Sequence, residues 1–396
     1  MLKGIPQRWR LLSGQDNWKN LLDPLDIDLR RYIIHYGERA QATYDTFDHE
    51  KASKYAGSSL YKPDVLFKSV GLYKRNPFKY KVVKYLYATS KTSVPDAFIV
   101  KSLSKDSVCK ESNFMGYVAV ATDEGKIALG RRDILVAWRG TIRNIELAKD
   151  FDFPLVPASV ILGKDINAKV HKGVLSIYTS SDPQSTYNKQ SARVQVLEAI
   201  KSLVEEFKKE EVSITIAGHS LGAALSTMNA ADIVANGYNK TRGMPNKSCM
   251  VTAFAFGSPR VGDSNFRNAF ESMNDLHLLR VRNIPDLVPQ VPPIPYADVG
   301  AELQIDSRKS PYLKRNGNLE IWHNLEAAYL HAVAGTQGSK GGFHLEVKRD
   351  ISLVNKILDA VKDEYLIPTG WWCLKNKGMV QQDDGSWKLE DHDRDN

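Results

Sequence analysis

Residues 212–229, which read VSITIAGHSLGAALSTMN, restrict what this chain can fold into more than any other stretch. Residues 212–217 form a short β-branched run with apolar side chains at alternate positions, which predicts a buried strand. Residues 218–222 read GHSLG, a G-x-S-x-G pentapeptide, and the alanine-rich run after it has high helical propensity. A strand, a sharp turn and a helix in this order are the context in which a nucleophile elbow presents a serine.

The pentapeptide contains the residue types that an activated serine needs. A serine hydroxyl becomes a useful nucleophile when a strained turn holds it clear of its own backbone and within reach of a base. Gly218 and Gly222 carry no side chains, so the strand and the helix can pass close together on either side of Ser220. The backbone N–H of Leu221 would point at the oxyanion that forms when Ser220 attacks a carbonyl. We therefore predict a catalytic Ser220, with Leu221 as an oxyanion-hole donor, in preference to an ordinary buried turn.

Composition places the chain among large globular proteins. Its 396 residues, 42% of them hydrophobic, can bury a sizeable α/β core. The three cysteines, Cys109, Cys249 and Cys373, are scattered and form no C-x-x-C pair, which is typical of a reduced, intracellular protein. No N-terminal run has the pattern of a signal peptide, and no stretch approaches the ~20 apolar residues of a membrane span. We therefore expect a cytoplasmic protein without a transmembrane segment.

The positive charge of the chain is concentrated in one segment. Residues 61–110 hold eleven Lys and Arg against three Asp, a surplus equal to the net charge of +8 of the whole chain. Tyrosines and lysines alternate through residues 80–88, which favours an edge strand with a solvated lysine face. Contact with an anionic lipid surface is the second interpretation. Nucleic-acid binding is the weakest, since no motif of that class is present.

Elements of the α/β class follow one another along the chain. Apolar side chains at helical spacing predict helices over 23–47, 191–211 and 351–361. Apolar, β-branched runs predict strands at 80–88, 113–121, 133–138, 251–256 and 276–284, and residues 237–248 are expected to be a loop. The alternation around the elbow favours a mostly parallel sheet with helices on both faces. We expect one domain over 1–380, with an N-terminal helical region at about 1–60, and a polar, poorly ordered tail at 381–396.

A second oxyanion donor is predicted just after the strand at 133–138. In serine hydrolases of this architecture, the loop after an earlier strand supplies the other donor. Thr141 follows that strand and offers both a backbone N–H and a hydroxyl, although an ordinary polar strand end is the alternative interpretation. Residues 142–157 carry apolar side chains among charges. They are equally compatible with a connecting helix and with a mobile lid.

The acid of a catalytic triad is predicted at Asp286. The strand at 276–284 delivers Asp286 at its carboxyl end, where ligands bind in open α/β sheets. Asp263, Asp298 and Asp306 are alternatives in loops that no strand feeds. The order serine, then acid, then histidine is the one expected for this architecture.

The base is predicted at His323, the first of three histidines that follow Asp286. His323 lies just before a run that predicts a helix, a position from which its ring can reach both the acid and the serine. His331 would lie inside that helix and His344 beyond a Gly/Ser loop, so both are weaker candidates. His171 precedes the elbow and is interpreted as a polar residue at a strand end.

Taken together, these stretches resemble a known family. The motifs WRGT (138–141), VHKG (170–173), GHSLGAALS (218–226), FGSPRVGD (256–263), NIPDLVP (283–289) and HNLEAAYLHAVAG (323–335) are similar to those of the plant class II phospholipase A1 enzymes, within the class 3, or fungal-type, lipases. The similarity extends over nearly the whole chain, from about residue 9 to residue 387. It departs at one point, because the histidine helix of the family reads HNLEAYLH and this chain has one more alanine after His323.

The resemblance implies an α/β-hydrolase fold and a serine acylhydrolase. Such an enzyme removes the sn-1 acyl chain of glycerophospholipids at a membrane or micelle surface, without a metal or other cofactor and without a nucleic-acid partner. By position, Ser220 is then the nucleophile, Asp286 orients the histidine, His323 is the general base and then acid, and Leu221 and Thr141 form the oxyanion hole. A galactolipase or a triacylglycerol or monoacylglycerol lipase would use the same triad. A non-catalytic lipid-signalling interaction protein is the least favoured alternative.

Overall fold

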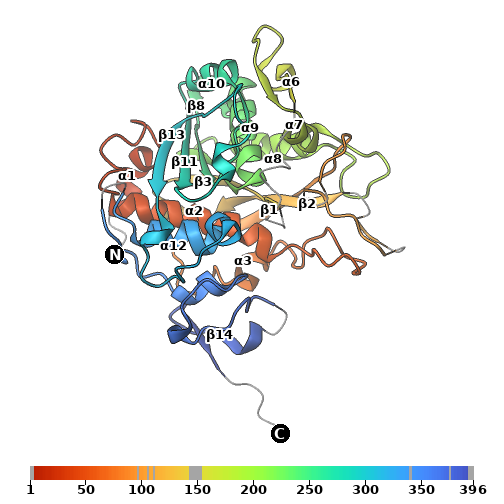
Figure 1. Ribbon diagram of the computed structural model, residues 1–396. Helices are drawn as coiled ribbons and strands as arrows, with labels where there is room; N and C mark the ends of the chain where they lie inside the picture. The colour runs from red at the N-terminus through yellow and green to blue at the C-terminus, as the bar shows by residue number, and fades with distance from the viewer. Residues whose placement is uncertain are drawn as a thin grey trace.

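A seven-stranded sheet runs through the centre of the molecule, in the strand order β1-β2-β3-β6-β9-β11-β13 (Figure 1). In chain order the strands are β1 (Tyr80–Ala88), β2 (Asn113–Ala121), β3 (Arg132–Trp138), β6 (Val212–His219), β9 (Met250–Phe256), β11 (Leu276–Asn283) and β13 (Ala301–Ile305). β1, β2 and β3 pair antiparallel, and the pairings from β3 to β13 are parallel. The predicted mostly parallel sheet is confirmed. This computed structural model describes residues 4–95, 98–104, 107–109, 112–141, 154–338, 341–373 and 376–390.

The sequence of each strand matches its place in the sheet. All residues of β3 and β6, at the centre, are buried, as expected of parallel strands that helices cover on both faces. β1 lies at the edge, where Lys81 and Lys84 are exposed while Val82 and Leu86 are buried. The predicted edge strand with a solvated lysine face is therefore confirmed.

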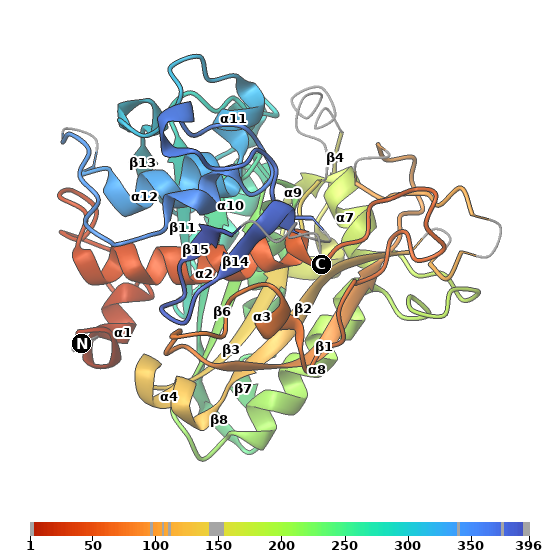
Figure 2. The same ribbon diagram turned by 90° about the horizontal axis from the view of Figure 1, so that it is seen from below.

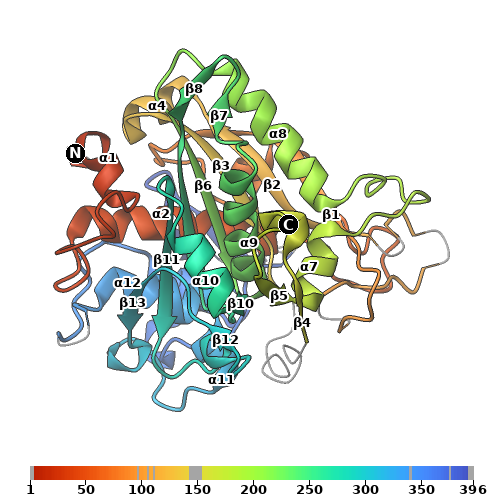
Figure 3. The same ribbon diagram turned by 90° about the horizontal axis from the view of Figure 1, so that it is seen from above.

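Helices cover both faces of the sheet. On one face lie α1 (Ile5–Leu12), α2 (Ile27–Asp45), a π-helix (Leu325–Leu330) and α12 (His331–Gly335) (Figure 2). On the other lie α7 (Lys172–Thr179), α8 (Ala192–Glu206) and α9 (Leu221–Ala235) (Figure 3). Each helical layer encloses an apolar core against the sheet. In the described part of the chain, no helix is long and apolar enough to cross a membrane.

Helices α2 and α8 are shorter than their apolar patterns predict, and a polar side chain caps the first turn of each. Asp26 accepts hydrogen bonds from the backbone N–H groups of Asp28 and Leu29, both at 3.0 Å, so α2 begins at Ile27 and not at residue 23. Ser191 caps α8 in the same way through the N–H of Val194. The last predicted turn, over 207–211, is not helical.

Smaller elements complete the fold. A four-stranded sheet has the order β12-β10-β5-β4 and consists of β4 (Leu155–Pro157), β5 (Lys169–His171), β10 (Gly262–Asp263) and β12 (Tyr296–Ala297). Two hairpins pair β7 (Lys240–Thr241) with β8 (Met244–Ser248), and β14 (Met379–Gln381) with β15 (Trp387–Leu389). The short α-helices are α3 (Leu66–Ser69), α4 (Asp123–Leu129), α6 (Ser159–Leu162), α10 (Ser264–Glu271) and α11 (Leu319–His323). The 3-10 helices are Val288–Gln290, Ser307–Lys309, Ile351–Asn355, Asp363–Tyr365 and Asn376–Gly378.

The structure differs from three predictions made for segments outside the central sheet. Residues 237–248 are not a simple loop, because β7 and β8 pair there. The helix expected over 351–361 is only the 3-10 turn Ile351–Asn355, since the Asn355 side chain accepts the backbone N–H groups of Ala360 and Val361 and redirects the chain. The tail expected to be poorly ordered from 381 instead continues into the β14–β15 hairpin, where the N–H of Trp387 donates to Asp350 at 2.6 Å. Residues 391–396 lie outside the described residues.

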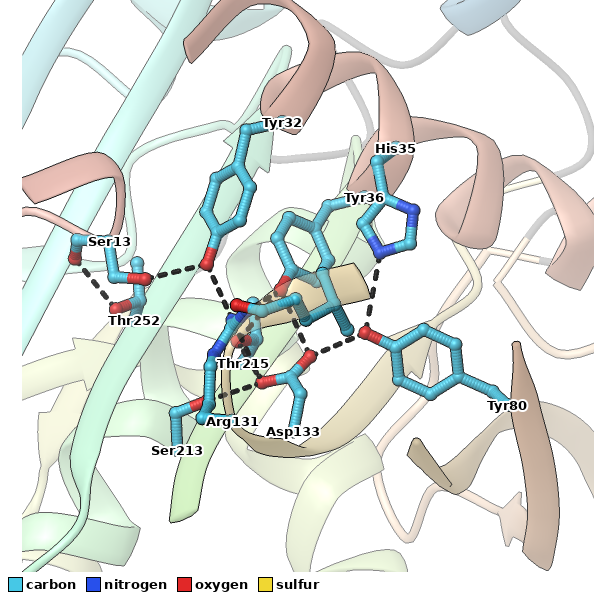
Figure 4. Close-up of polar contacts among 11 residues, drawn as sticks. Ser13, Tyr32, His35, Tyr36, Tyr80, Arg131, Asp133, Ser213, Thr215 and Thr252 are labelled. Atoms are coloured by element: carbon cyan, nitrogen blue, oxygen red, sulfur yellow. Dashed lines mark hydrogen bonds and ion pairs between the residues drawn. The ribbon is translucent and has the colours of Figure 1, made fainter. Parts of the chain in front are cut away.

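A buried polar cluster joins α2 to the first residues of the central strands (Figure 4). Asp133 of β3 accepts hydrogen bonds from Tyr36 of α2 at 3.0 Å and from Tyr80 of β1 at 2.6 Å. The guanidinium of Arg131 donates to the Tyr36 hydroxyl at 2.8 Å and pairs with Asp133 at 3.3 Å. Both charges are fully buried. Since a buried charge is costly unless it is paired and hydrogen-bonded, these contacts determine where α2 lies on the sheet.

Candidate active site

Ser220 lies between the end of β6 and the start of α9, where the elbow motif predicts it. Its backbone has φ 59° and ψ −127°, a conformation that residues other than glycine rarely adopt and that persists only where the fold imposes it. A Cβ atom on Gly218 would lie 2.2 Å from the carbonyl oxygen of Gly222, and one on Gly222 would lie 2.3 Å from the carbonyl oxygen of Trp138. Only glycine fits at these two positions, so the strand and the helix approach closely enough to form the sharp turn.

Asp286 and His323 lie together as an acid and base pair. Asp286 follows β11, and His323 is the last residue of α11. Nδ1 of His323 lies 2.7 Å from Oδ2 of Asp286, and both side chains are buried. Tyr329 also donates its hydroxyl to Oδ2, and the other carboxylate oxygen accepts the N–H of Val288 at 3.0 Å. These contacts hold the carboxylate so that it can orient the imidazole through Nδ1.

The serine oxygen and the outer nitrogen of the histidine are both unpaired. Within the described residues, Ser220 Oγ and His323 Nε2 are buried without a hydrogen-bond partner. The chain at 256–257 lies against both residues. The N–H of Ser220 donates to the carbonyl of Phe256 at 2.9 Å, and a Cβ on Gly257 would lie 3.1 Å from Cε1 of His323. Nε2 is therefore available to accept a proton, and catalytic hydrogen bonds that are long in the free enzyme tighten when substrate binds.

The two predicted oxyanion donors, Leu221 and Thr141, lie next to the nucleophile. Leu221 is the first residue of α9, so its N–H has no acceptor within its own helix. The strand end that leads to Thr141 runs beside the elbow, since a Cβ on Gly140 would lie 3.2 Å from Cβ of Ser220. Thr141 is buried and lines a cavity of 140 Å³ together with His219. Two donors on either side of a serine are what an oxyanion hole requires.

The alternative acids and histidines have other structural roles. Asp263 caps α10, Asp298 pairs with Arg260, Asp306 pairs with Arg308, and His171 ends β5 and caps α7. His331 lies 2.7 Å from the hydroxyl of Ser310, and burial lowers its pKa to about 3. His344 is exposed. Among these candidates, only Asp286 and His323 contact each other.

Three residues beside the predicted triad, His219, Asn283 and Tyr329, were not predicted to have a role at the site. Nε2 of His219 lies 2.7 Å from the carbonyl oxygen of His323. Asn283 donates to the carbonyl of the preceding residue, Trp322, at 2.9 Å. Burial, and then the charge of Asp286, raises the pKa of Tyr329 well above its usual value, so its hydroxyl remains a donor. His219 lies inside the elbow motif, Asn283 opens the motif NIPDLVP and Tyr329 lies in HNLEAAYLHAVAG, so the motifs could have pointed to all three.

The extra alanine after His323 falls in the π-helix Leu325–Leu330. A π-helix bonds residue i to residue i+5, so it takes up one more residue per turn than an α-helix, and such turns are frequent at functional sites. Before the extra residue, His323 contacts Asp286, and after it, Tyr329 contacts Asp286 and His331 contacts Ser310.

The segment predicted as a connecting helix or a lid is described only in part. Residues 142–153 lie outside the described residues. Leu155–Pro157 form β4, which pairs antiparallel with β5. The described end of this segment is therefore a strand and not a helix.

The chain has close relatives among known proteins. The lipase (class 3) family model matches residues 135–296. Phospholipase A1-II 1 of Oryza sativa subsp. japonica is 56% identical over 396 residues, which cover 100% of this chain and 98% of that protein. Phospholipase A1-IIgamma of Arabidopsis thaliana is 55% identical over 393 residues, which cover 98% of this chain and 94% of that protein. This chain belongs to the phospholipase A1-II family.

Membership of this family confirms the resemblance derived from the motifs. The protein is a carboxylic ester hydrolase of the lipase class with an α/β-hydrolase fold, and its substrates are lipids. Among solved structures, a nonglycosylated lipase of Yarrowia lipolytica aligns over 72% of this chain and 82% of its own, with 18% identity and a TM-score of 0.47.

Proposed function

We propose that this phospholipase A1-II family member hydrolyses the sn-1 acyl ester of glycerophospholipids by a two-step acyl transfer through Ser220. The observation that supports the triad most is the contact of 2.7 Å between His323 and Asp286, beside an unpaired serine oxygen on a strained turn. A serine hydroxyl is a weak nucleophile until a positioned base takes its proton. The likeness to phospholipases A1-II over the whole chain supports the choice of ester.

In the first step, Oγ of Ser220 attacks the sn-1 carbonyl carbon while Nε2 of His323 takes the hydroxyl proton. Nδ1–H of His323 donates to Asp286, whose charge stabilises the imidazolium that forms. The oxyanion accepts hydrogen bonds from Leu221 and Thr141, and one such donor contributes about 3 kcal/mol to transition-state stability. The bond between the carbonyl carbon and the glycerol oxygen then breaks, and His323 gives the proton to that oxygen.

In the second step, water releases the acyl group from the enzyme. The lysophospholipid has left, and His323 now removes a proton from a water molecule as its oxygen attacks the acyl carbonyl. The same oxyanion donors stabilise the second tetrahedral intermediate. The bond between the acyl carbon and Oγ breaks, the proton returns to Ser220, and the fatty acid leaves.

We further propose that the protein makes transient, peripheral contact with the lipid surface around this site. Leu287, directly after Asp286, is 45% exposed, and Ile294 on the same loop is 91% exposed. Leu319, at the start of the helix that ends at His323, is 43% exposed. Large apolar side chains left in water beside a site for lipid esters are suited to enter the acyl region of a phospholipid surface.

The compartment that we propose is the cytoplasm. Cys109, Cys249 and Cys373 are all free thiols, and Cys373 is exposed. Unpaired cysteines persist where cellular reductants keep them reduced, and exposed ones are the most readily oxidised elsewhere.

The test of the proposed activity uses phosphatidylcholine that carries different labels in its sn-1 and sn-2 acyl chains. We expect the wild-type protein to release the sn-1 label, and Ser220→Ala to lose at least about 10⁴-fold of the rate without a lower unfolding temperature. Ser226→Ala is a matched control, because Ser226 lies on α9, the helix that follows Ser220, and its hydroxyl donates to the Gly222 carbonyl at 2.8 Å. The control should keep its activity.

Each other outcome removes a different part of the proposal. Substantial turnover by Ser220→Ala would contradict the assignment of the nucleophile. Release of the sn-2 label would contradict the positional assignment. If the wild-type protein leaves phosphatidylcholine intact but cleaves galactolipid, triacylglycerol or a soluble p-nitrophenyl ester, the triad stands and the substrate is wrong.

A further inference from the structure

Two hydrogen bonds in series connect helix α2 to the backbone of the proposed catalytic base. The hydroxyl of Tyr44 lies 2.9 Å from Nδ1 of His219, and Nε2 of His219 lies 2.7 Å from the carbonyl oxygen of His323. The two histidine rings lie with their centroids 4.6 Å apart, and both side chains are buried. A residue 175 positions before the elbow histidine therefore reaches the triad through a single side chain.

The chemistry of the partners decides the direction of both bonds. A carbonyl oxygen can only accept, so Nε2 of His219 carries the ring hydrogen and donates it to His323. Burial, and then the neighbouring His323, lowers the pKa of His219 well below its usual value, so the ring is neutral and Nδ1 has a lone pair. The Tyr44 hydroxyl donates to that lone pair. Without this hydroxyl, Nδ1 would lose its hydrogen-bond donor, and a buried acceptor without a partner costs free energy.

The Tyr44 hydroxyl also lies against Gly140, just after the end of β3. A Cβ on Gly140 would lie 2.0 Å from the Tyr44 hydroxyl oxygen and 2.4 Å from the carbonyl oxygen of His219. Gly140 precedes Thr141, the proposed oxyanion donor. The hydroxyl of Tyr44 thus lies where the oxyanion strand, the elbow and the base come together, and it lines the same cavity as Thr141 and His219.

We propose that Tyr44 and His219 are positioning residues, which hold the backbone of His323 so that its Nε2 stands at the correct distance from Ser220. This inference rests on the proposed function, because it assigns His323 as the base. Asp286 holds only the ring, through Nδ1, and the carbonyl of His323 is held by His219. Since Ser220 Oγ and Nε2 share no hydrogen bond within the described residues, their separation depends on these anchors. A displacement of about 1 Å can cost about 100-fold in rate.

The primary test compares Tyr44→Phe with Tyr117→Phe, using a soluble p-nitrophenyl ester to obtain kcat and KM separately. Each substitution removes one tyrosine hydroxyl. Tyr44 lies on α2, and Tyr117 lies on β2, is buried and donates to the carbonyl of Arg39 on α2 at 2.8 Å. Of these two hydroxyls, only that of Tyr44 contacts His219. We expect Tyr44→Phe to lower kcat by about 10- to 100-fold with little change in KM, and Tyr117→Phe to keep the wild-type kcat.

The second test asks whether the hydrogen bond, and not the shape, of His219 matters. In His219→Gln the side-chain amide can donate N–H to the His323 carbonyl and offer its oxygen to Tyr44. His219→Phe keeps a ring of similar size but has neither group. We expect the Gln variant to retain kcat within about tenfold of wild type and the Phe variant to lose about 100-fold or more. If one of these variants does not fold, the comparison of Tyr44→Phe with Tyr117→Phe decides.

The outcomes that overturn the inference differ from those that overturn the function. If Ser220→Ala is inactive and Tyr44→Phe has the wild-type kcat, the triad stands and the positioning role is wrong. Equal losses of kcat and of unfolding temperature in Tyr44→Phe and Tyr117→Phe would show a general structural role for both hydroxyls and would also overturn it. Turnover by Ser220→Ala contradicts the function itself, and this inference with it.

Discussion

Two buried polar clusters lie at opposite ends of β3 and β6, and the same helix covers both. At the amino end of the strands, Tyr36 of α2 meets Asp133 (Figure 4). At the carboxyl end, Tyr44 meets His219 beside the triad. The two tyrosines are about two turns apart, or about 12 Å along the helix axis.

The first group is called the structural cluster and consists of Tyr36, Tyr80, Arg131, Asp133, Ser213 and Thr215. The second is called the catalytic cluster and consists of Tyr44, His219, Ser220, Asp286, His323 and Tyr329.

The two clusters differ in whether their central atoms are satisfied. The donors to the carboxylate of Asp133 are Tyr36, Tyr80, Arg131, Ser213 and Thr215, at 2.6 to 3.3 Å. In the catalytic cluster, by contrast, Ser220 Oγ and His323 Nε2 are buried without a partner in the described structure. A fully satisfied network stabilises a unique arrangement, whereas unpaired buried groups cost free energy. The comparison shows that the ion pair of the structural cluster is fully hydrogen-bonded, whereas the two atoms that the proposed reaction uses have no partner in the described residues.

The same substitution of Asp by Asn should therefore lower activity at Asp286 and stability at Asp133. The larger effect is expected at Asp286. In Asp286→Asn the amide would donate an N–H to Nδ1 of His323, which moves the ring hydrogen to Nε2 and removes the base. We expect kcat on a p-nitrophenyl ester to fall by about 10⁴-fold, while the free energy of unfolding in urea changes by less than about 2 kcal/mol. A variant whose kcat stays within tenfold of wild type would show that Asp286 does not orient the base.

The second largest effect is expected at Asp133, and it is on stability. Asp133→Asn leaves the charge of Arg131 buried without a counter-charge, because both side chains are completely inaccessible to solvent. Removing one partner of a buried ion pair costs about 3–5 kcal/mol of the free energy of unfolding. The kcat of the folded fraction should stay close to the wild-type value.

A matched control for Asp133 is Thr215→Val, which removes only one of its neutral donors, at 2.7 Å. This change should cost about 1 kcal/mol of unfolding free energy. If Asp133→Asn costs no more than the control, the ion pair does not stabilise the structural cluster. If it lowers kcat in the folded protein, the two clusters are coupled through α2.

The smallest expected effect is on the pH dependence of stability, through His35. Burial, and then the positive charges of Arg39 and Arg131, lowers the pKa of His35 well below its usual value. The folded state then binds fewer protons than the unfolded state below about pH 6.5, so stability is complete above that pH and falls as the pH decreases. His35→Gln should reduce this slope by up to about 1.4 kcal/mol per pH unit below about pH 6.

Urea unfolding at a series of pH values checks this expectation, with kcat at pH 7 as the second measurement. His35 belongs to the surroundings of the structural cluster, since its Nε2 lies 3.3 Å from the Tyr80 hydroxyl. Its replacement should therefore leave kcat unchanged. An unchanged slope would assign the acid sensitivity to other buried groups, such as His331.

Local pattern was enough for most of the fold and for the candidates at the site. The strands at 80–88 and 113–121 appear as predicted, because apolar and β-branched residues recur at the strand period. Ser220 was predicted as the nucleophile because the G-x-S-x-G spacing, the strand before it and the helix after it are all local features. Asp286 and His323 were predicted from their positions after a strand and before a helix, in the order that this architecture expects.

Local pattern was not enough where a particular side-chain contact changes the outcome. The apolar spacing at 351–361 predicts a helix, yet the side chain of Asn355 takes the N–H groups of Ala360 and Val361. The polar composition of the tail predicts poor order, yet Trp387 lies against Trp371 and Trp372. In both cases two specific contacts outweigh the average tendency of the segment.

The sequence by itself determined the class of the protein. The elbow and the alternation of strands and helices follow from neighbouring residues, and the order of the predicted triad residues follows from their positions along the chain. Only the tertiary structure decided which side chains surround that triad. Tyr44, His219 and His323 come from three separate segments, and their hydrogen bonds exist only after α2 and the histidine helix pack on the same face of the sheet. The physical reason is that periodicity reports which face of an element is buried, whereas a hydrogen bond depends on where two distant faces meet.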